Sequence, residues 1–182
     1  IGDAIAKREL FPVYFGSALR NEGVRELMDG IDVFSVAKDY KEEFSATVYK
    51  ISRDSDGNRL THMKITGGSL KVRTSIPDYG KVNQIRVYNG TSFETKDEVE
   101  AGCICAVTGL NDTRAGLVMG NGEELLPVLT PVLRYKVIFP PAVSIQTMLF
   151  KLKELTEEIP ELNVSYDEEV KEINIELMGQ VQ

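Results

Sequence analysis

The middle of the chain, about residues 43–127, consists of short apolar runs separated by turn-forming residues. The runs are FSATVYKI (44–51), RLTHMKIT (59–66), SLKVRTSI (69–76), KVNQIRVYN (81–89) and CICAVTGL (103–110). They are rich in β-branched residues, and Asp-Ser-Asp-Gly-Asn at 54–58 makes a turn between the first two. Five or more strands at this spacing predict a small antiparallel β-barrel. The run at 103–110 is nearly all apolar, which predicts a strand buried on both faces.

The first 37 residues have a different periodicity. FPVYF at 11–15 predicts a short buried strand. Apolar residues then recur at helical spacing after Asn21, a predicted N-cap: Val24, Leu27, Met28 and Ile31. The residues before Leu10 are typical of the end of another helix. Helix, strand, helix predicts the last unit of an α/β sheet.

The last segment, residues 131–182, combines both periodicities. LRYKVIF at 133–139 predicts a strand, and a helix is expected from Ser144 as N-cap to a stop at Pro160. Two alternating runs follow at 162–166 and 173–177. The order β-α-β-β is that of a ferredoxin-like unit without its second helix and fourth strand.

The fold class predicted is therefore a multidomain α+β fragment in three parts. These are the end of an α/β domain (1–37), an antiparallel β-barrel (43–127) and a partial ferredoxin-like unit (131–182). Linkers are expected at 37–43 and 125–131. Because the chain begins at Ile1 and the last unit is incomplete, we expect a piece of a longer protein.

Charge narrows the possible partners. The net charge of −7 argues against a general nucleic-acid or membrane-surface binder, and no apolar run approaches the roughly 18 residues needed to span a bilayer. Residues 44–88, however, hold eight positive and three negative side chains, a local charge of +5. This segment predicts a face that meets phosphates. The alternative is that strand residues simply point charges at water.

Few residues could form a catalytic or metal site. No P-loop is present in the sequence. Cys103, Cys105 and His62 could supply three soft metal ligands, but the cysteines are better explained as small buried residues. Ser17 follows a predicted strand as a hydrolase nucleophile would, with His62 as its base, but Leu19 stands where G-x-S-x-G has its second glycine.

A carboxylate-rich stretch lies on or just after the predicted helix of the last segment. Its members are Glu154, Glu157, Glu158 and Glu161. A solvated helix face is the expectation for such a group.

The three segments, taken in this order, resemble the successive domains of a known protein family. FPVYFGSALRNEGVRELMDGI (11–31) resembles the end of the GTPase domain in elongation-factor-G-like translational GTPases, and Ser17-Ala18-Leu19 matches the family's fifth guanine-nucleotide motif. VEAGCICAVTGLNDTRAG (99–116) is similar to a recurrent stretch of their second domain, although Cys103 stands where the family usually has Asp. Residues 131–182 resemble the start of the third domain, and 178–182 sit where the family has a motif that opens the next helix.

Within that superfamily the chain resembles most the ribosomal-protection tetracycline resistance proteins. The V-Y-x-G-S-A opening, the short linker into the barrel and the L-x-G-x-V-Q ending point there. Elongation factor G itself and the class-II release-factor GTPases share most of these signals, so both remain alternatives.

The resemblance implies a cytoplasmic parent protein that uses GTP and Mg, binds the ribosome through small-subunit RNA and, in the resistance branch, promotes tetracycline release. Ser17, Ala18 and Leu19 would contact the guanine base, mainly through backbone groups. Arg53, Arg59, Lys64 and Arg73 are the candidate contacts to ribosomal RNA. The chain lacks the P-loop, switch and N-K-x-D motifs, so no bound nucleotide, metal or GTPase activity is expected of it alone, and no membrane or DNA partner is expected. A non-enzymatic RNA- or protein-binding barrel module is the remaining alternative.

Overall fold

The computed structural model describes residues 1–35, 39–122 and 130–179. These fall into two compact units, Ile1–Asp39 and Tyr40–Gln182, which are described separately. Both predicted linkers lie partly outside the described residues, as do residues 180–182 of the predicted helix-opening motif. No helix in the described ranges is long and apolar enough to cross a membrane.

The first unit contains two helices, α1 (Gly2–Ala6) and α2 (Val24–Phe34), which confirms the two predicted helices. The predicted strand at 11–15 is wrong: those residues are irregular. A strand needs a partner for its backbone groups, and no strand of the described part of this unit lies beside it. The start of α2 also differs from the prediction. Its N-cap is Gly23 in the left-handed conformation (φ 69°), so Asn21 does not cap the helix.

One face of α2 packs against the irregular segment that precedes it. Gly30 is buried there, and a side chain at this position would collide with the hydroxyl of Tyr14. Much of the unit's apolar surface is nevertheless open to solvent. Phe15 is 91% exposed, Val13 75% and Met28 59%. These residues have the composition of a core without being covered.

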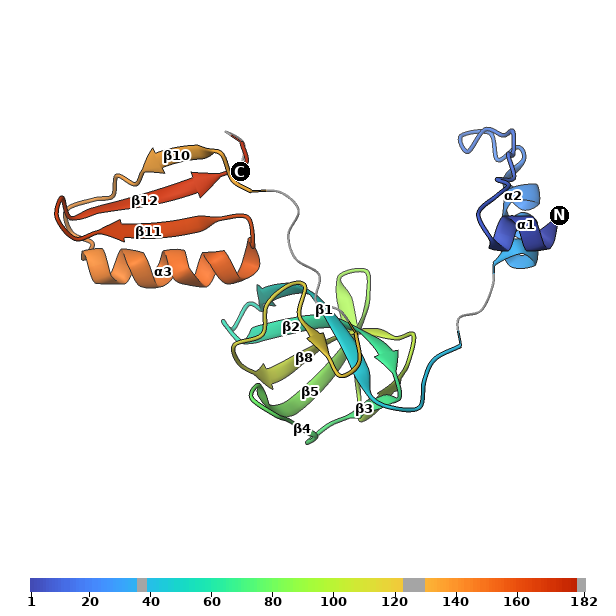
Figure 1. The fold of residues 1–182 in the computed structure, drawn as a ribbon, viewed down its shortest axis with the longest axis horizontal. Coiled ribbons are helices and arrows are strands. Elements are labelled where there is room, and N and C mark those ends of the chain that lie inside the picture. The colour runs from blue at the N-terminus through green and yellow to red at the C-terminus, as the bar shows by residue number, and fades with distance from the viewer. Residues whose placement is uncertain (36–38, 123–129, 180–182) are drawn as a thin grey trace. The chain divides into compact units, whose positions relative to one another are not determined.

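The second unit begins with a curled, mostly antiparallel sheet (Figure 1). Six strands follow the order β4-β5-β8-β2-β1-β9, β6 pairs with β5, and β3 pairs with β7 in a separate ribbon. The strands are β1 (Ser45–Arg53), β2 (Arg59–Gly67), β3 (Ser69–Lys71), β4 (Ser75–Ile76), β5 (Gly80–Asn89), β6 (Ser92–Lys96), β7 (Glu98–Glu100), β8 (Ile104–Leu110) and β9 (Val118–Met119). Four of the five strands predicted from the sequence are present as β1, β2, β5 and β8. The predicted strand at 69–76 is wrong as a single strand, because a turn divides it into β3, which pairs with β7, and β4, which pairs with β5. The curled sheet agrees with a β-barrel.

Alternate residues of these strands fill one core. Along β2, Thr61, Met63 and Ile65 are completely buried, and each points inward while the residue between them faces out. The core cluster takes its other members from nearly every strand: Ala46, Val48, Ile51, Leu70, Val82, Ile85, Cys105, Val107, Leu110 and Met119 among them. The expectation that β8 is buried on both faces is wrong at its start, because Ile104 is 54% exposed.

The remainder of the second unit consists of β10 (Leu133–Lys136), α3 (Ile145–Glu158), β11 (Asn163–Asp167) and β12 (Glu172–Leu177), which confirms the predicted order β-α-β-β. Both outer strands run antiparallel to β12, which lies between them, so this is a split β-α-β arrangement. The helix α3 lies alongside β11 of the three-stranded sheet (Figure 1).

The helix α3 begins where the sequence predicts. The Ser144 side chain accepts a hydrogen bond from the backbone N–H of Thr147, which confirms Ser144 as the N-cap. The helix ends at Glu158, before Pro160. Strand β10 is shorter than the predicted 133–139 and ends at Lys136, although Val137 still donates to the carbonyl of Ile173 at 2.9 Å.

Candidate functional site

The predicted guanine-contact residues lie in a tight loop between the irregular segment and α2. The loop is closed by a two-way backbone bridge: the N–H of Ser17 donates to the carbonyl of Glu22 (2.9 Å), and the N–H of Glu22 donates back (3.1 Å). Inside the bridge, the N–H of Asn21 donates to the carbonyl of Ala18 at 3.2 Å. These bonds hold the backbone of residues 17–22 in one shape.

Two backbone donors of this loop stay unused. Within the described ranges, the N–H groups of Ala18 and Leu19 donate no hydrogen bond to the protein, and the Leu19 side chain is 98% exposed. A cavity of about 220 Å³ adjoins the loop, lined by Tyr14, Ser17 and Ala18 among others. Exposed backbone N–H groups on a rigid turn suit an acceptor such as a carbonyl oxygen of a base. The role of Ser17, Ala18 and Leu19 as base contacts stays a prediction.

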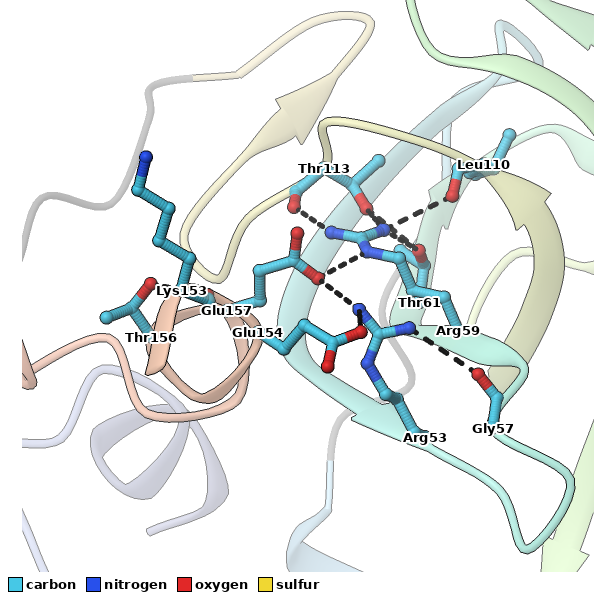
Figure 2. Close-up of polar contacts among 10 residues, drawn as sticks. All are labelled: Arg53, Gly57, Arg59, Thr61, Leu110, Thr113, Lys153, Glu154, Thr156 and Glu157. Atoms are coloured by element: carbon cyan, nitrogen blue, oxygen red, sulfur yellow. Dashed lines mark hydrogen bonds and ion pairs between the residues drawn. The ribbon is translucent and has the colours of Figure 1, made fainter. Parts of the chain in front are cut away.

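The structure places two of the four predicted RNA-contact residues in ion pairs inside the chain (Figure 2). Arg53 ends β1 and Arg59 begins β2, so the β1–β2 turn brings them together. Both bind the same carboxylate oxygen of Glu157 on α3: the Arg59 Nε lies 2.9 Å from it and the Arg53 Nη2 lies 3.2 Å from it. Arg53 also pairs with Glu154 at 3.3 Å.

Arg59 is the more tightly held of the two arginines. Its Nη1 donates to the Thr113 hydroxyl (2.6 Å) and the Leu110 carbonyl (3.2 Å), while its Nη2 donates to the Thr113 carbonyl (2.5 Å). The side chain is only 13% exposed. All three of its nitrogens therefore have partners, which leaves little of the guanidinium for an external phosphate.

Arg53 is held less completely. Its side chain is 27% exposed, one nitrogen donates weakly to the Gly57 carbonyl at 3.5 Å, and its buried Nε has no hydrogen-bond partner in the described residues.

The prediction of a solvated carboxylate face on α3 is wrong for Glu154 and Glu157, because both form ion pairs with these arginines. We call Arg53, Arg59, Glu154 and Glu157 the α3–barrel ion cluster.

The other two candidate RNA contacts are exposed. Lys64 lies in the middle of β2, paired with Thr47 on one side and Ile104 on the other. Arg73 lies in the turn before β4, in the left-handed conformation (φ 71°), and its backbone N–H donates to the Val82 carbonyl. Within the described residues, no ion pair occupies either side chain. Their role stays a prediction.

Of the two cysteines, Cys105 is a small buried residue as expected, whereas Cys103 is only partly buried. Cys105 is buried in the core, where burial, with Cys103 nearby, raises its thiol pKa to about 12. His62 faces the opposite side of the sheet, because it alternates with the core residues Thr61 and Met63 on β2. The described residues contain no group of three or more His, Cys, Asp or Glu side chains that could hold a metal.

The environment of His62 was not anticipated from sequence. Its Nε2 shares a hydrogen bond of 2.7 Å with the Ser52 hydroxyl. Burial lowers the pKa of His62, and the nearby charge of Lys50 lowers it further, so the ring is neutral at pH 7. It also lies beside Tyr49 and Tyr88, with centroid separations of 6.1 and 6.0 Å.

Comparison with known proteins gives similarities to elongation factor G. Residues 43–120 match the family model described as elongation factor G domain 2. The chain is 28% identical to an elongation factor G 2 of Syntrophus aciditrophicus, over 100% of this chain and 31% of the relative. It is likewise 28% identical to an elongation factor G of Ureaplasma parvum serovar 3, over 100% of this chain and 31% of that protein. The chain thus spans about a third of the length of these relatives.

A solved structure shares the fold. The crystal structure of a protein from Thermus thermophilus matches with a TM-score of 0.77, over 99% of this chain and 29% of that one. Its sequence identity of 22% makes this a likeness of fold alone. The similarity to elongation factors G therefore rests on the family model over residues 43–120 and on the two relatives.

Proposed function

We propose that the chain is part of a ribosome-associated translational GTPase and that it helps the parent protein to bind the ribosome in the cytoplasm. The observation that carries the proposal is the alignment of the whole chain, 100% of it, with elongation factors G. Its barrel also matches the second domain of that family at residues 43–120.

Within this proposal each segment has a place. Residues 1–37 would end the GTPase domain, residues 43–127 would form the second domain, and residues 131–182 would form part of the third. The uncovered apolar side chains of the first unit support the first assignment, since the rest of a GTPase domain would bury them. The split β-α-β arrangement supports the third.

The parent protein would bind GTP with Mg, and this chain would contribute contacts to the guanine base. The two unused N–H groups at Ala18 and Leu19 and the adjoining cavity support that role. The sequence contains no P-loop, so the chain alone would not hold the phosphates or hydrolyse GTP.

Small-subunit ribosomal RNA would be the partner of the barrel. Of the predicted contacts, Lys64 and Arg73 are the two whose side chains are open to an RNA phosphate, whereas Arg53 and Arg59 face α3. This favours an RNA contact at Lys64, in the middle of β2, or at Arg73, in the turn before β4.

The branch of the family is the finer part of the proposal. The V-Y-x-G-S-A and L-x-G-x-V-Q motifs support a ribosomal-protection protein that promotes tetracycline release. The relatives named above are elongation factors, and they support the elongation branch. Expressing the parent reading frame in a tetracycline-sensitive bacterium separates the two: growth in tetracycline supports the resistance branch, and sensitivity equal to that of the empty host contradicts it.

Co-sedimentation of the purified chain with isolated small ribosomal subunits tests the proposed function. We expect binding at low salt that weakens as salt rises, because each neutralised phosphate releases counterions. Absence of binding at low salt would contradict the proposal. A parallel GTPase assay should show no turnover by the chain, and robust turnover would contradict our assignment of the missing motifs.

A parent protein without a P-loop would instead favour the binding-module alternative. Sequencing the parent reading frame upstream of this segment checks this. A P-loop and an N-K-x-D motif there would support the translational GTPase.

A further inference from the structure

Four aromatic rings form a row on the outer face of the barrel sheet. They come from four different strands: Tyr49 (β1), His62 (β2), Tyr88 (β5) and Phe93 (β6). Along the row, successive ring centroids are 6.1, 6.0 and 5.4 Å apart. We call these four side chains the aromatic row.

A small residue makes the row continuous. The strand β8 lies between β2 and β5, so His62 and Tyr88 are separated by two strand spacings, about 10 Å. Their rings nevertheless approach to 6.0 Å. Ala106 on β8 pairs with His62 on one side and with Arg86 on the other. The two rings can lean over this short side chain, which agrees with its complete burial.

A bulge adds the first member of the row. The register of β1 with β2 shifts between Val48 and Lys50, which leaves Tyr49 as an extra residue without a partner. A bulge re-aims side chains, and Tyr49 is 50% exposed. Tyr88 and Phe93 are 39% and 44% exposed. The rings are tilted by 34–55° to one another, so they do not cover each other's faces.

Positive charge accompanies the aromatic row. Lys50 pairs with His62 across the strands, and Lys64 lies two residues from His62 on the same face. Both lysines are exposed, and neither has a carboxylate partner among the described residues. They are therefore available to phosphate groups beside the rings.

Arg86 has a different role, because it fixes the end of the row. Its guanidinium binds Asp54 at 3.0 Å and Gln84 at 2.6 Å, and its Cζ lies 4.6 Å from the centroid of Phe93. The side chain is only 11% exposed. It thus holds the ring of Phe93 through a cation–π contact rather than reaching into solvent.

We propose that the aromatic row binds unpaired bases of RNA by stacking, with Lys50 and Lys64 contacting the adjoining phosphates. Exposed aromatic rings on neighbouring strands, flanked by cations, are a combination that single-stranded nucleic acid uses, because every base has a face that can stack. An apolar protein partner would not need the two lysines. The inference rests on the proposed function, since it names the part of the ribosomal RNA that the barrel would meet.

Fluorescence anisotropy of the purified chain with a labelled single-stranded polyuridine, and with an RNA duplex of equal length, tests the inference. Tyr88→Leu and Phe93→Leu should each weaken binding of the single strand about 5- to 100-fold. Tyr135→Leu is the matched control, because Tyr135 is similarly exposed (41%) but lies on β10. Lys64→Gln should reduce the slope of log affinity against log salt by about 0.7. Circular dichroism confirms that each variant is folded, and Lys64→Gln, at an exposed position, serves as the variant least able to disturb folding.

Small ribosomal subunits are titrated in parallel, so that the two proposals fail separately. If row variants bind the single strand as well as Tyr135→Leu does, while subunits are still bound, the inference is overturned and the proposed function stands. If the single strand is bound through the row but subunits are not, the inference stands and the proposed function fails. If Tyr88→Leu abolishes subunit binding although the original chain ignores the single strand and the duplex alike, the row contacts a protein, which overturns the inference.

Discussion

Replacing Glu157 should loosen the attachment of α3 to the barrel without unfolding the barrel. Glu157 is the shared member of the α3–barrel ion cluster, and its removal breaks the contacts to both Arg59 (2.9 Å) and Arg53 (3.2 Å) (Figure 2). In Glu157→Gln the side chain keeps its shape and loses its charge. Arg59 still has its partners at Thr113 and Leu110, so the β2 side of the contact stays ordered.

The size of the stability loss expected for Glu157→Gln follows from how exposed the paired side chains are. Fully exposed ion pairs contribute about 0.2–1 kcal/mol, and hydrogen bonds to charged groups that are better buried contribute about 1.5–3 kcal/mol. Glu157 is 39% exposed and Arg59 13%, which lies between these cases. Arg53, whose buried Nε is unsatisfied, adds less. We therefore expect a loss of about 1–2 kcal/mol, a roughly 5- to 30-fold shift toward undocked α3.

Amide hydrogen exchange measures this shift segment by segment. Protection should fall across Ile145–Glu158 and stay unchanged in β1, β2 and β8. Glu158→Gln is the matched control: it is the next residue, it is half-buried, and no ion pair in the described residues involves it. Equal loss of protection in the two variants, or none in Glu157→Gln, would refute the claim that these ion pairs hold α3.

Three further predictions concern stability. Gly109→Ala should lower the free energy of unfolding by about 3 kcal/mol, because Gly109 has φ 94° and a Cβ there would collide with the Lys81 carbonyl. Gly57→Ala should lower it by only about 1 kcal/mol, because Gly57 has φ 80° but faces open space. Urea unfolding compares the two variants, and equal losses would contradict the clash at Gly109. Ser144→Ala should lower α3 stability by about 1 kcal/mol through loss of its N-cap bond, seen as reduced helical circular dichroism and hydrogen-exchange protection at the start of α3. Burial opposes ionisation of Asp54, but hydrogen bonds from its own turn and from Arg86 outweigh it and lower the pKa of Asp54. The ionised carboxylate therefore stabilises the fold fully above the unfolded-state pKa, about 4. This stabilisation is lost as the pH falls through the lower pKa of the folded state. Melting curves between about pH 5 and pH 2 should show a shallower acid loss in Asp54→Asn than in the original chain, and identical curves would contradict the assignment.

Local signals predicted most of the elements. The helix α3 could be placed because its N-cap, its apolar spacing and Pro160 all lie within one stretch of chain. The strands β1, β2, β5 and β8 could be placed because alternation and turn residues are also local. The strand prediction at 11–15 is wrong, because a strand forms only where another strand pairs with its backbone groups. Such a partner strand is remote in sequence, so a local pattern does not reveal it.

The candidate site was less predictable for the same reason. Ser17, Ala18 and Leu19 are adjacent, so a motif could identify them. The partners of Arg53 and Arg59 are 104 and 98 residues further along, on a helix that a sequence pattern assigns to solvent. The sequence therefore shows correctly that the segment 44–88 is basic. It does not show that Arg53 and Arg59 of this segment form ion pairs within the chain.

Composition and periodicity thus predicted most of the helices and strands, and that the segment 44–88 is basic. Only the folded chain decided which charges are neutralised and which aromatic rings gather. The aromatic row needs five strands in register, a bulge at Tyr49 and a small Ala106 on β8 between His62 and Tyr88. Side-chain neighbours across a sheet are set by strand order and register, and hydrogen bonds between segments remote in sequence determine both.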